Sequence, residues 1–283
     1  MFARGLVHVH RTIIMSASEE EMATRIAIET IYAMGPSSMC NHGLGAAELA
    51  FMSRSEIGGK TAHVYGDSEM DILVQLLELM RGHLHAEDTF VDLGSGSGRL
   101  TMYFAALTPV AKAIGVELSP TRHAQAIKAQ RALALQLDAG PIEERLEFVC
   151  ASMLQHDVAG ATIVFCFCLC LDAPFLTRLE SHLLARLPLG AVVVLRGKQF
   201  PRVAQKEPDG QPLLRRLELR LQHGMYFAYC VVRDGDESRE PLRPRLKQMW
   251  EDIGTSAYRR AYLVEDDGMQ VLSLRTALGS APA

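Results

Sequence analysis

A glycine-rich turn between an apolar strand and a helix constrains the fold of this chain more than any other feature of its sequence. Residues 89–93 form a short β-prone run, and residues 94–98 read Gly-Ser-Gly-Ser-Gly. Glycine tolerates positive φ and carries no Cβ, so such a turn can bend sharply and let a ligand approach its backbone. The segment predicts a strand, a turn and a helix that build one side of a binding site.

The alternation of strand and helix continues through the centre of the chain. Five short apolar runs predict buried strands, at residues 89–93, 112–117, 146–150, 162–169 and 191–195. Helical patterns separate them, at residues 99–107, 120–137 and 173–187. Short apolar strands that alternate with helices form a parallel sheet covered on both faces. We therefore expect a doubly wound, Rossmann-like α/β fold with a mostly parallel sheet.

Segments on both sides of this region are predicted to add to it. Residues 213–221 and 225–232 flank the tripeptide Gln-His-Gly and predict an antiparallel hairpin at the edge of the sheet. Upstream, helical patterns cover residues 18–34, 46–52 and 68–81. The first two helices are expected to form a small N-terminal extension.

Two acidic residues bracket the glycine-rich turn. Asp92 stands two residues before the first glycine, and Glu117 ends the next predicted strand. A carboxylate at that strand end can bind both ribose hydroxyls of a nucleoside, while Asp92 can accept a hydrogen bond from an ammonium. The Gly-x-Gly-x-Gly spacing differs from the Gly-x-Gly-x-x-Gly that holds a pyrophosphate in dinucleotide enzymes. We predict S-adenosylmethionine as the cofactor, with a nicotinamide enzyme and a ligand-free turn as alternatives.

The predicted cofactor-binding residues gather around this turn and one later strand end. Ser152 follows the third predicted strand, where many methyltransferases place an acid for the adenine amino group, and its hydroxyl can also accept a hydrogen bond. The residues expected from position and chemistry to bind the cofactor are Asp92, Gly94, Ser95, Gly96, Gly98, Glu117 and Ser152.

Three segments between Val64 and Phe200 together resemble one methyltransferase family. Residues 64–67 read Val-Tyr-Gly-Asp, residues 90–98 contain the glycine-rich turn, and residues 115–124 run from the second strand into the next helix. They are similar to the Tyr-Gly-Glu loop, the cofactor loop and the ribose-binding segment of the disruptor-of-telomeric-silencing (Dot-type, non-SET) histone H3 lysine methyltransferases.

The resemblance implies a class I methyltransferase that acts on a lysine in the globular core of histone H3. It implies that Tyr65, Gly66 and Asp67 close over the methionine end of the cofactor. It also implies that Tyr65 and Tyr229 line the lysine channel as catalytic residues. A nucleosome as partner and the nucleus as location follow from the same resemblance.

Two departures from the family pattern keep other functions open. Asp67 replaces the usual Glu, and residues 165–172 read Phe-Cys-Phe-Cys-Leu-Cys-Leu-Asp where the family commonly has an Asn-Asn pair with aromatic residues. The lost amides are groups expected to hold the cofactor or shape the lysine entrance. The alternatives are a methyltransferase for a non-histone protein or a small molecule, and a catalytically silent cofactor-binding partner.

These patterns divide the chain into three parts. We expect a leader and helical extension over residues 1–62, an S-adenosylmethionine-binding catalytic domain over residues 63–235 and a C-terminal extension over residues 236–283. Arg4 and Arg11 precede the first acidic residue, a composition similar to a mitochondrial presequence. The mitochondrion is therefore the alternative location.

Charge and cysteine spacing argue against several other classes. The formal net charge of −4 is unlike that of a general nucleic-acid coat, so contact with nucleic acid is expected to be weak or indirect. No run of about eighteen apolar residues predicts a membrane span. The alternation of Cys166, Cys168 and Cys170 is unlike the spacing of zinc ligands, so we expect free thiols and no metal. The oligomeric state is left open.

Overall fold

A computed structural model describes the central part of the chain and parts of its flanks. The described residues are 18–33, 44–52, 77, 80, 84–137, 140–201, 212–221 and 224–233. Tyr65, Gly66, Asp67 and the C-terminal extension lie outside them, as does most of the helix expected over residues 68–81.

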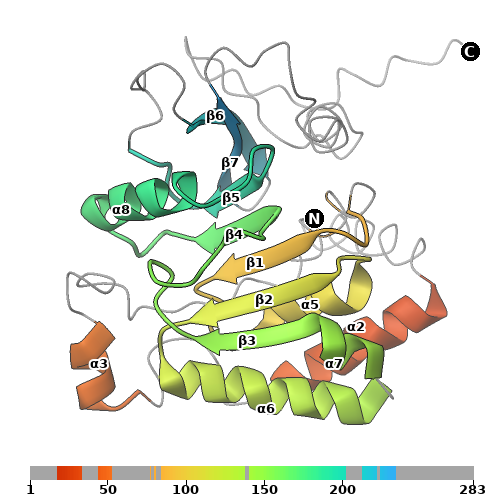
Figure 1. Cartoon of the computed structure of the whole chain (residues 1–283). Coiled ribbons are helices and arrows are strands. Elements are labelled where there is room, and N and C mark those ends of the chain that lie inside the picture. The colour runs from red at the N-terminus through yellow and green to blue at the C-terminus, as the bar shows by residue number, and fades with distance from the viewer. Residues whose placement is uncertain are drawn as a thin grey trace, which may run out of the picture.

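Five parallel strands form the centre of the structure, as the sequence predicted. They are β1 (Thr89–Leu93), β2 (Lys112–Glu117), β3 (Leu146–Cys150), β4 (Ile163–Phe167) and β5 (Val192–Arg196). Their order in the sheet is β3-β2-β1-β4-β5 (Figure 1). The chain reverses its direction of winding between β1 and β4, which is where ligands bind in open parallel sheets, beyond the carboxyl ends of the strands.

Two further strands extend the sheet past β5. They are β6 (Pro212–Leu221) and β7 (Gly224–Arg233), which pair antiparallel with each other. Strand β7 also pairs antiparallel with β5, placing Tyr229 opposite Val193.

Helices cover both faces of the sheet, and one further helix lies beyond the carboxyl ends of its strands. They are α2 (Glu19–Ala33), α3 (Ala46–Met52), α5 (Arg99–Leu107), α6 (Pro120–Leu137), α7 (Gly140–Arg145) and α8 (Ala173–Leu184). In Figure 1, α2, α5 and α6 lie on the same side of the sheet, and α3 lies beyond the tips of the strand arrows. The sequence did not predict α7, and α8 ends three residues earlier than predicted. After Leu184 the Arg186 N–H donates to the Leu183 carbonyl, three residues back, which tightens the last turn.

Local capping explains where two of these helices begin. Ser119 Oγ accepts the N–H of Arg122 at 3.1 Å, and Pro120 occupies the first position of α6, where no N–H is required. Asp172 Oδ1 accepts the N–H of Phe175 at 2.8 Å and starts α8 in the same way. Both helices therefore start directly after loops that leave the carboxyl ends of strands.

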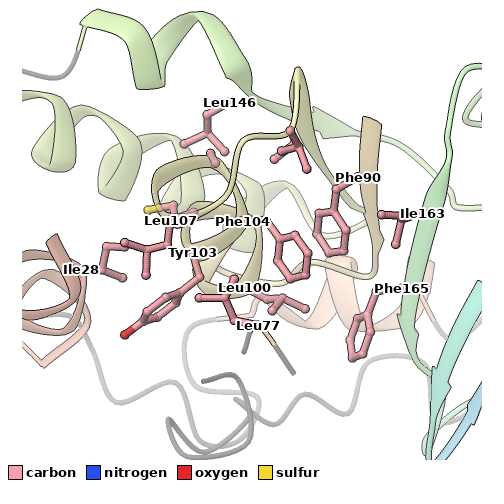
Figure 2. Packing of buried hydrophobic residues seen from close by; sticks show 14 of the residues in the cluster. Ile28, Leu77, Phe90, Leu100, Tyr103, Phe104, Leu107, Leu146, Ile163 and Phe165 are labelled. Atoms are coloured by element: carbon pink, nitrogen blue, oxygen red, sulfur yellow. The ribbon is translucent and has the colours of Figure 1, made fainter. Parts of the chain in front are cut away.

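One hydrophobic cluster lies between the sheet and helices α2, α5 and α6. Phe90 of β1 stacks on Phe104 of α5 with ring centroids 3.7 Å apart, and Ile28 of α2 packs into the same cluster (Figure 2). Burying such side chains stabilises the fold by about 2 kcal/mol each. This packing fixes α5 against β1.

A second cluster covers the opposite face of the sheet. Val91 and Leu93 alternate with Phe90 along β1, so they point to this face and pack with Phe175 and Leu179 of α8. The sheet is thus buried on both sides, which explains why its strands are apolar without alternation.

The described cysteines are free thiols. Cys166 and Cys168 are buried, and burial raises the pKa of both, that of Cys168 to about 11. In the part of the chain that the structure describes, no cluster of His, Cys, Asp and Glu side chains has the arrangement of a metal site. No described helix is long and apolar enough to cross a membrane.

Candidate cofactor site

The glycine-rich turn is bent through three residues with positive φ. Gly94, Gly96 and Gly98 have φ values of 86°, 57° and 87°. The N–H groups of Gly94 and Ser95 donate to the Val116 carbonyl at 2.8 and 3.1 Å. The turn is therefore fastened to the end of β2 by its own backbone.

Two glycines make room for the ring of Phe148. A Cβ on Gly98 would lie 2.4 Å from Phe148 Cζ, and a Cβ on Gly115 would lie 2.6 Å from Phe148 Cδ1. By contrast, a Cβ on Gly94 would first meet Met153, at 3.5 Å. Gly98 thus serves packing beneath the turn, whereas a Cβ on Gly94 would make only an ordinary van der Waals contact.

Glu117 links the turn to the start of α6. Its Oε2 accepts the N–H of Gly96 at 2.8 Å, and its Oε1 accepts the N–H of Ser119 at 2.8 Å. Burial raises the pKa of Glu117 despite these hydrogen bonds and the Arg122 guanidinium, whose Nη1 lies 4.0 Å from Oε1. A carboxylate has about four acceptor positions, so Glu117 keeps capacity for further donors.

Asp92 lies under the same turn and is 4% exposed. Thr101 Oγ1 donates to its Oδ2 at 3.0 Å. Burial raises the pKa of Asp92 to about 7, and the nearby charge of Glu117 adds to this rise. A cationic group bound close to both carboxylates would lower their pKa values and keep them ionised. The two predicted acids are therefore brought together in an arrangement that favours a positively charged ligand.

The buried side-chain hydroxyl of Ser95 makes no hydrogen bond to the described residues. Its oxygen lies where a Cβ on Gly115 would approach to 2.8 Å. Buried hydroxyls are rarely left unpaired in folded proteins. An orphaned hydroxyl in the turn is consistent with a small polar ligand or a water completing the site.

Ser152 shapes the loop that follows β3. Its Oγ accepts the N–H of Leu154 at 3.3 Å, and its carbonyl accepts the N–H groups of Gln155 and His156. Ala151, just before it, donates to the Glu117 carbonyl at 3.0 Å. The predicted adenine-side residue is therefore anchored next to the end of β2.

Tyr229 lies in the core behind the site. Its ring is 1% exposed and packs against Phe200 with centroids 5.1 Å apart, and its hydroxyl accepts the N–H of Phe200 at 3.0 Å. The sequence predicted a channel residue at this position. The hydroxyl is buried and bonded to the segment that follows β5.

The loops after β4 and β5 are tied to each other where the sequence lacks the Asn-Asn pair. The N–H of Cys168 donates to the Arg196 carbonyl at 3.0 Å, and Cys168 Sγ lies 3.2 Å from that carbonyl and 3.1 Å from that of Lys198. The Arg196 guanidinium lies 4.7 Å from the centre of the Phe167 ring. A thiol thus provides a link between the loops at this end of the sheet.

The N-terminal helices contribute contacts that the sequence did not predict. Tyr32 of α2 donates its hydroxyl to the Ser97 carbonyl at 2.7 Å, so α2 holds the glycine-rich turn from below. Glu29 pairs with the Arg99 guanidinium and accepts the hydroxyl of Tyr103 at 2.8 Å. These partners are 65 or more residues apart in sequence, so no local pattern could have indicated them.

Glu48 of α3 is a third carboxylate at this end of the sheet. It accepts hydrogen bonds from the side chains of Ser119 and Thr121, next to Glu117. The sequence predicted helix α3 but not its place in the fold, because a short apolar segment does not specify which part of the fold it packs against.

The family described as "Histone methylation protein DOT1" matches residues 57–196. That range contains the glycine-rich turn, both acids that bracket it, and Ser152. It also contains residues 64–67, which lie outside the described structure.

Two curated proteins are similar to the same part of the chain. Both are named histone-lysine N-methyltransferase, H3 lysine-79 specific, one from Caenorhabditis elegans and one from Drosophila melanogaster. Each is 28% identical, over 140 and 127 residues, covering 47% and 43% of this chain. The aligned parts are only 15% and 7% of the relatives' own lengths.

Solved structures of methyltransferases also resemble the fold at low identity. An RNA methyltransferase from Salinibacter ruber in complex with S-adenosyl-L-homocysteine is 22% identical, with a TM-score of 0.44, covering 60% of this chain and 95% of its own. A precorrin-6y C5,15-methyltransferase from Geobacter metallireducens is 12% identical, with a TM-score of 0.41, covering 59% and 90%.

Proposed function

Because residues 57–196 belong to the DOT1 family of histone methylation proteins, we propose that the chain is an S-adenosylmethionine-dependent protein-lysine N-methyltransferase. Its proposed substrate is a lysine in the globular core of histone H3 within the nucleosome, which implies a nuclear location. The names of the two relatives make lysine-79 of H3 the first residue to test. The proposed catalytic domain spans residues 63–235.

The observation that carries the cofactor proposal is the pair of buried acids beneath one glycine-rich turn. When bound, the cofactor supplies a methyl group on a positively charged sulfur. Asp92 and Glu117 give the site its negative charge when they are ionised, and a bound cation would lower the pKa that burial raises in each carboxyl. Glu117 can accept from two ribose hydroxyls with the acceptor positions its backbone contacts leave open. The orphaned hydroxyl of Ser95 can take part in the same site.

Methyl transfer needs the chain to hold the acceptor in line and to exclude water, rather than to attack the methyl group itself. We propose that Tyr65, Gly66 and Asp67 close over the methionine end of the cofactor. We propose Tyr65 and Tyr229 as the walls of the lysine channel, where an apolar surrounding favours the neutral amine. Ser152 is proposed to accept from the adenine amino group.

A transfer assay on recombinant nucleosomes tests this function. The full chain should transfer tritium from S-adenosyl-[methyl-³H]methionine to histone H3, and Glu117→Gln should reduce the transfer. Nucleosomes in which lysine-79 of H3 is replaced by arginine should lose the label. Label in free histones or small molecules with none in nucleosomes would reject the histone substrate, and absence of S-adenosylhomocysteine binding would reject the cofactor.

A catalytically silent cofactor-binding partner is the second candidate. The replacement of the family's Asn-Asn pair by a segment in which Cys168 binds the carbonyls of Arg196 and Lys198 favours it. This candidate predicts tight binding of S-adenosylhomocysteine with no methyl transfer to nucleosomes, free histones or cell extract.

A further inference from the structure

Helix α3 lies at the carboxyl-end side of the parallel strands. Figure 1 shows it beyond the strand tips and next to the first turn of α6. Met52 is buried at the end of the helix, while the Glu48 side chain reaches the α6 start. The segment is therefore placed beside Glu117, the acid proposed to bind the ribose.

Glu48 makes three hydrogen bonds to the beginning of α6. Ser119 Oγ donates to Glu48 Oε1, Thr121 Oγ1 donates to Oε2 at 2.6 Å, and the Thr121 N–H donates to Oε1 at 3.2 Å. Partial burial raises the pKa of Glu48, but these hydrogen bonds and the Arg122 charge outweigh it, so the net pKa is lowered. Glu48 is thus an ionised carboxylate at a helix N-terminus, where a negative charge is stabilising.

Ser119 connects Glu48 to Glu117. It is fully buried, and its hydroxyl both donates to Glu48 and accepts the N–H of Arg122 at 3.1 Å. Its own N–H donates to Glu117 Oε1 at 2.8 Å. The other oxygen of Glu117 accepts the N–H of Gly96. A continuous hydrogen-bonded chain therefore runs from α3 through the start of α6 to the glycine-rich turn.

We propose that Glu48 is a positioning residue for the cofactor site. It holds Ser119 so that the Glu117 carboxylate is oriented by two backbone N–H groups and presents its remaining acceptor positions to the ribose hydroxyls. The inference rests on the proposed function, since it assumes a nucleoside cofactor on Glu117. Preorganised acceptors bind more tightly because less ordering is required when the ligand arrives.

A role as a simple helix cap is the competing explanation, and ligand chemistry separates the two. Loss of a cap weakens the fold and would weaken every ligand of the site by the same factor. Loss of a positioning residue weakens ligands with ribose hydroxyls more than ligands without them. Adenosine and 2′,3′-dideoxyadenosine differ only in those two hydroxyls.

The experiment compares full-length wild type with Glu48→Ala, which removes both acceptor oxygens from the start of α6. Glu144→Ala, which changes an exposed residue of α7, is the matched control. Calorimetry with S-adenosylhomocysteine and competition with the two nucleosides give the dissociation constants. Glu48→Ala should raise the Kd for S-adenosylhomocysteine and for adenosine by about five- to tenfold, the size of one or two lost hydrogen bonds. The Kd for 2′,3′-dideoxyadenosine should change less than twofold.

Each other outcome has a definite meaning. If wild type does not bind S-adenosylhomocysteine, the proposed function fails first. If wild type binds and Glu48→Ala binds equally well, or loses both nucleosides in the same proportion, the positioning role is wrong. Ser119→Ala breaks the same link while keeping the Ser119 N–H. It should reproduce the selective loss, and it takes the place of Glu48→Ala if that variant does not fold.

Discussion

The Glu117 carboxylate accepts the backbone N–H of Gly96 at 2.8 Å, so the end of β2 fixes the centre of the glycine-rich turn. The turn is already attached to β2 by the Val116 carbonyl. A side chain that orients the loop and also remains able to accept further donors can couple ligand binding to loop geometry. The predictions below test that coupling and the packing around it.

Replacing Glu117 by Gln should weaken cofactor binding. The amide cannot accept hydrogen bonds with both of its heavy atoms, so either Gly96 or Ser119 loses its partner, and the negative charge is lost as well. We expect the Kd for S-adenosylhomocysteine to rise at least about tenfold in calorimetry. Glu144→Gln should bind as wild type does. An unchanged Kd for Glu117→Gln would contradict the assignment of the ribose site.

Asp92 should make the stability of the protein depend on pH near neutrality. Its pKa is about 7 in the folded state against an ordinary aspartate value of 3.8, so the folded state holds the proton more tightly. This contribution to stability is complete below about pH 3.8 and is lost as the pH rises through 7. Between pH 5.5 and 8.5 the free energy of unfolding should fall by about 2 kcal/mol because of this group.

Urea unfolding of wild type and Asp92→Asn at the two pH values measures this effect. The free energy of unfolding of wild type minus that of Asp92→Asn should fall by about 2 kcal/mol between pH 5.5 and 8.5, because the other titrating groups are common to both proteins. Whereas stability falls as the pH rises, the affinity for S-adenosylhomocysteine should increase from pH 6 to pH 8, because the ligand's ammonium binds the ionised carboxylate better. Parallel pH profiles for the two proteins would show that Asp92 titrates in the ordinary range.

Gly98→Ala should destabilise the fold. Its φ of 87° disfavours a side chain, and the new Cβ would lie 2.4 Å from Phe148 Cζ. We expect a loss of about 2–4 kcal/mol in the free energy of unfolding by urea. The control is Gly160→Ala, where a Cβ meets nothing within 4 Å. Combining Gly98→Ala with Phe148→Leu should recover part of the loss, and strict additivity would argue against the clash.

Tyr32→Phe should loosen the glycine-rich turn without disturbing the core. It removes the hydrogen bond from α2 to the Ser97 carbonyl, worth about 1 kcal/mol. The Kd for S-adenosylhomocysteine should rise about threefold to fivefold. Tyr103→Phe is the matched comparison, because its hydroxyl bonds Glu29 instead of the turn. Equal effects of the two variants on affinity would show that α2 acts only through stability.

The two buried cysteines of the β4 region should respond differently to serine. Cys168→Ser places a hydroxyl within reach of the Arg196 and Lys198 carbonyls, so its stability should stay within about 1 kcal/mol of wild type. Cys166→Ser buries a hydroxyl in the apolar cluster on the α8 face and should cost about 1–3 kcal/mol. Thermal unfolding measures the stability of both variants. A larger loss of stability for Cys168→Ser than for Cys166→Ser would refute the hydrogen-bonding role of Cys168.

Local sequence patterns gave the central fold correctly. The apolar runs became the five parallel strands, and Ser119 with Pro120 marked the start of α6, because strand periodicity and helix capping depend on residues close together in sequence. The same holds for Asp92 and Glu117. Each stands at a strand end, and parallel strands bring their carboxyl ends to one edge of the sheet.

The contacts that complete the site depended on tertiary structure. Glu48 reaches Ser119 across 71 residues, and Tyr32 reaches Ser97 across 65. Tyr229 has a hydroxyl bonded to Phe200, a placement that an alternating strand pattern does not specify. Sequence alone therefore determined which elements form and which acids flank the turn, since those follow from local backbone geometry. Only the folded chain decided which distant polar groups hold them in place, because that depends on how the helices pack against the sheet.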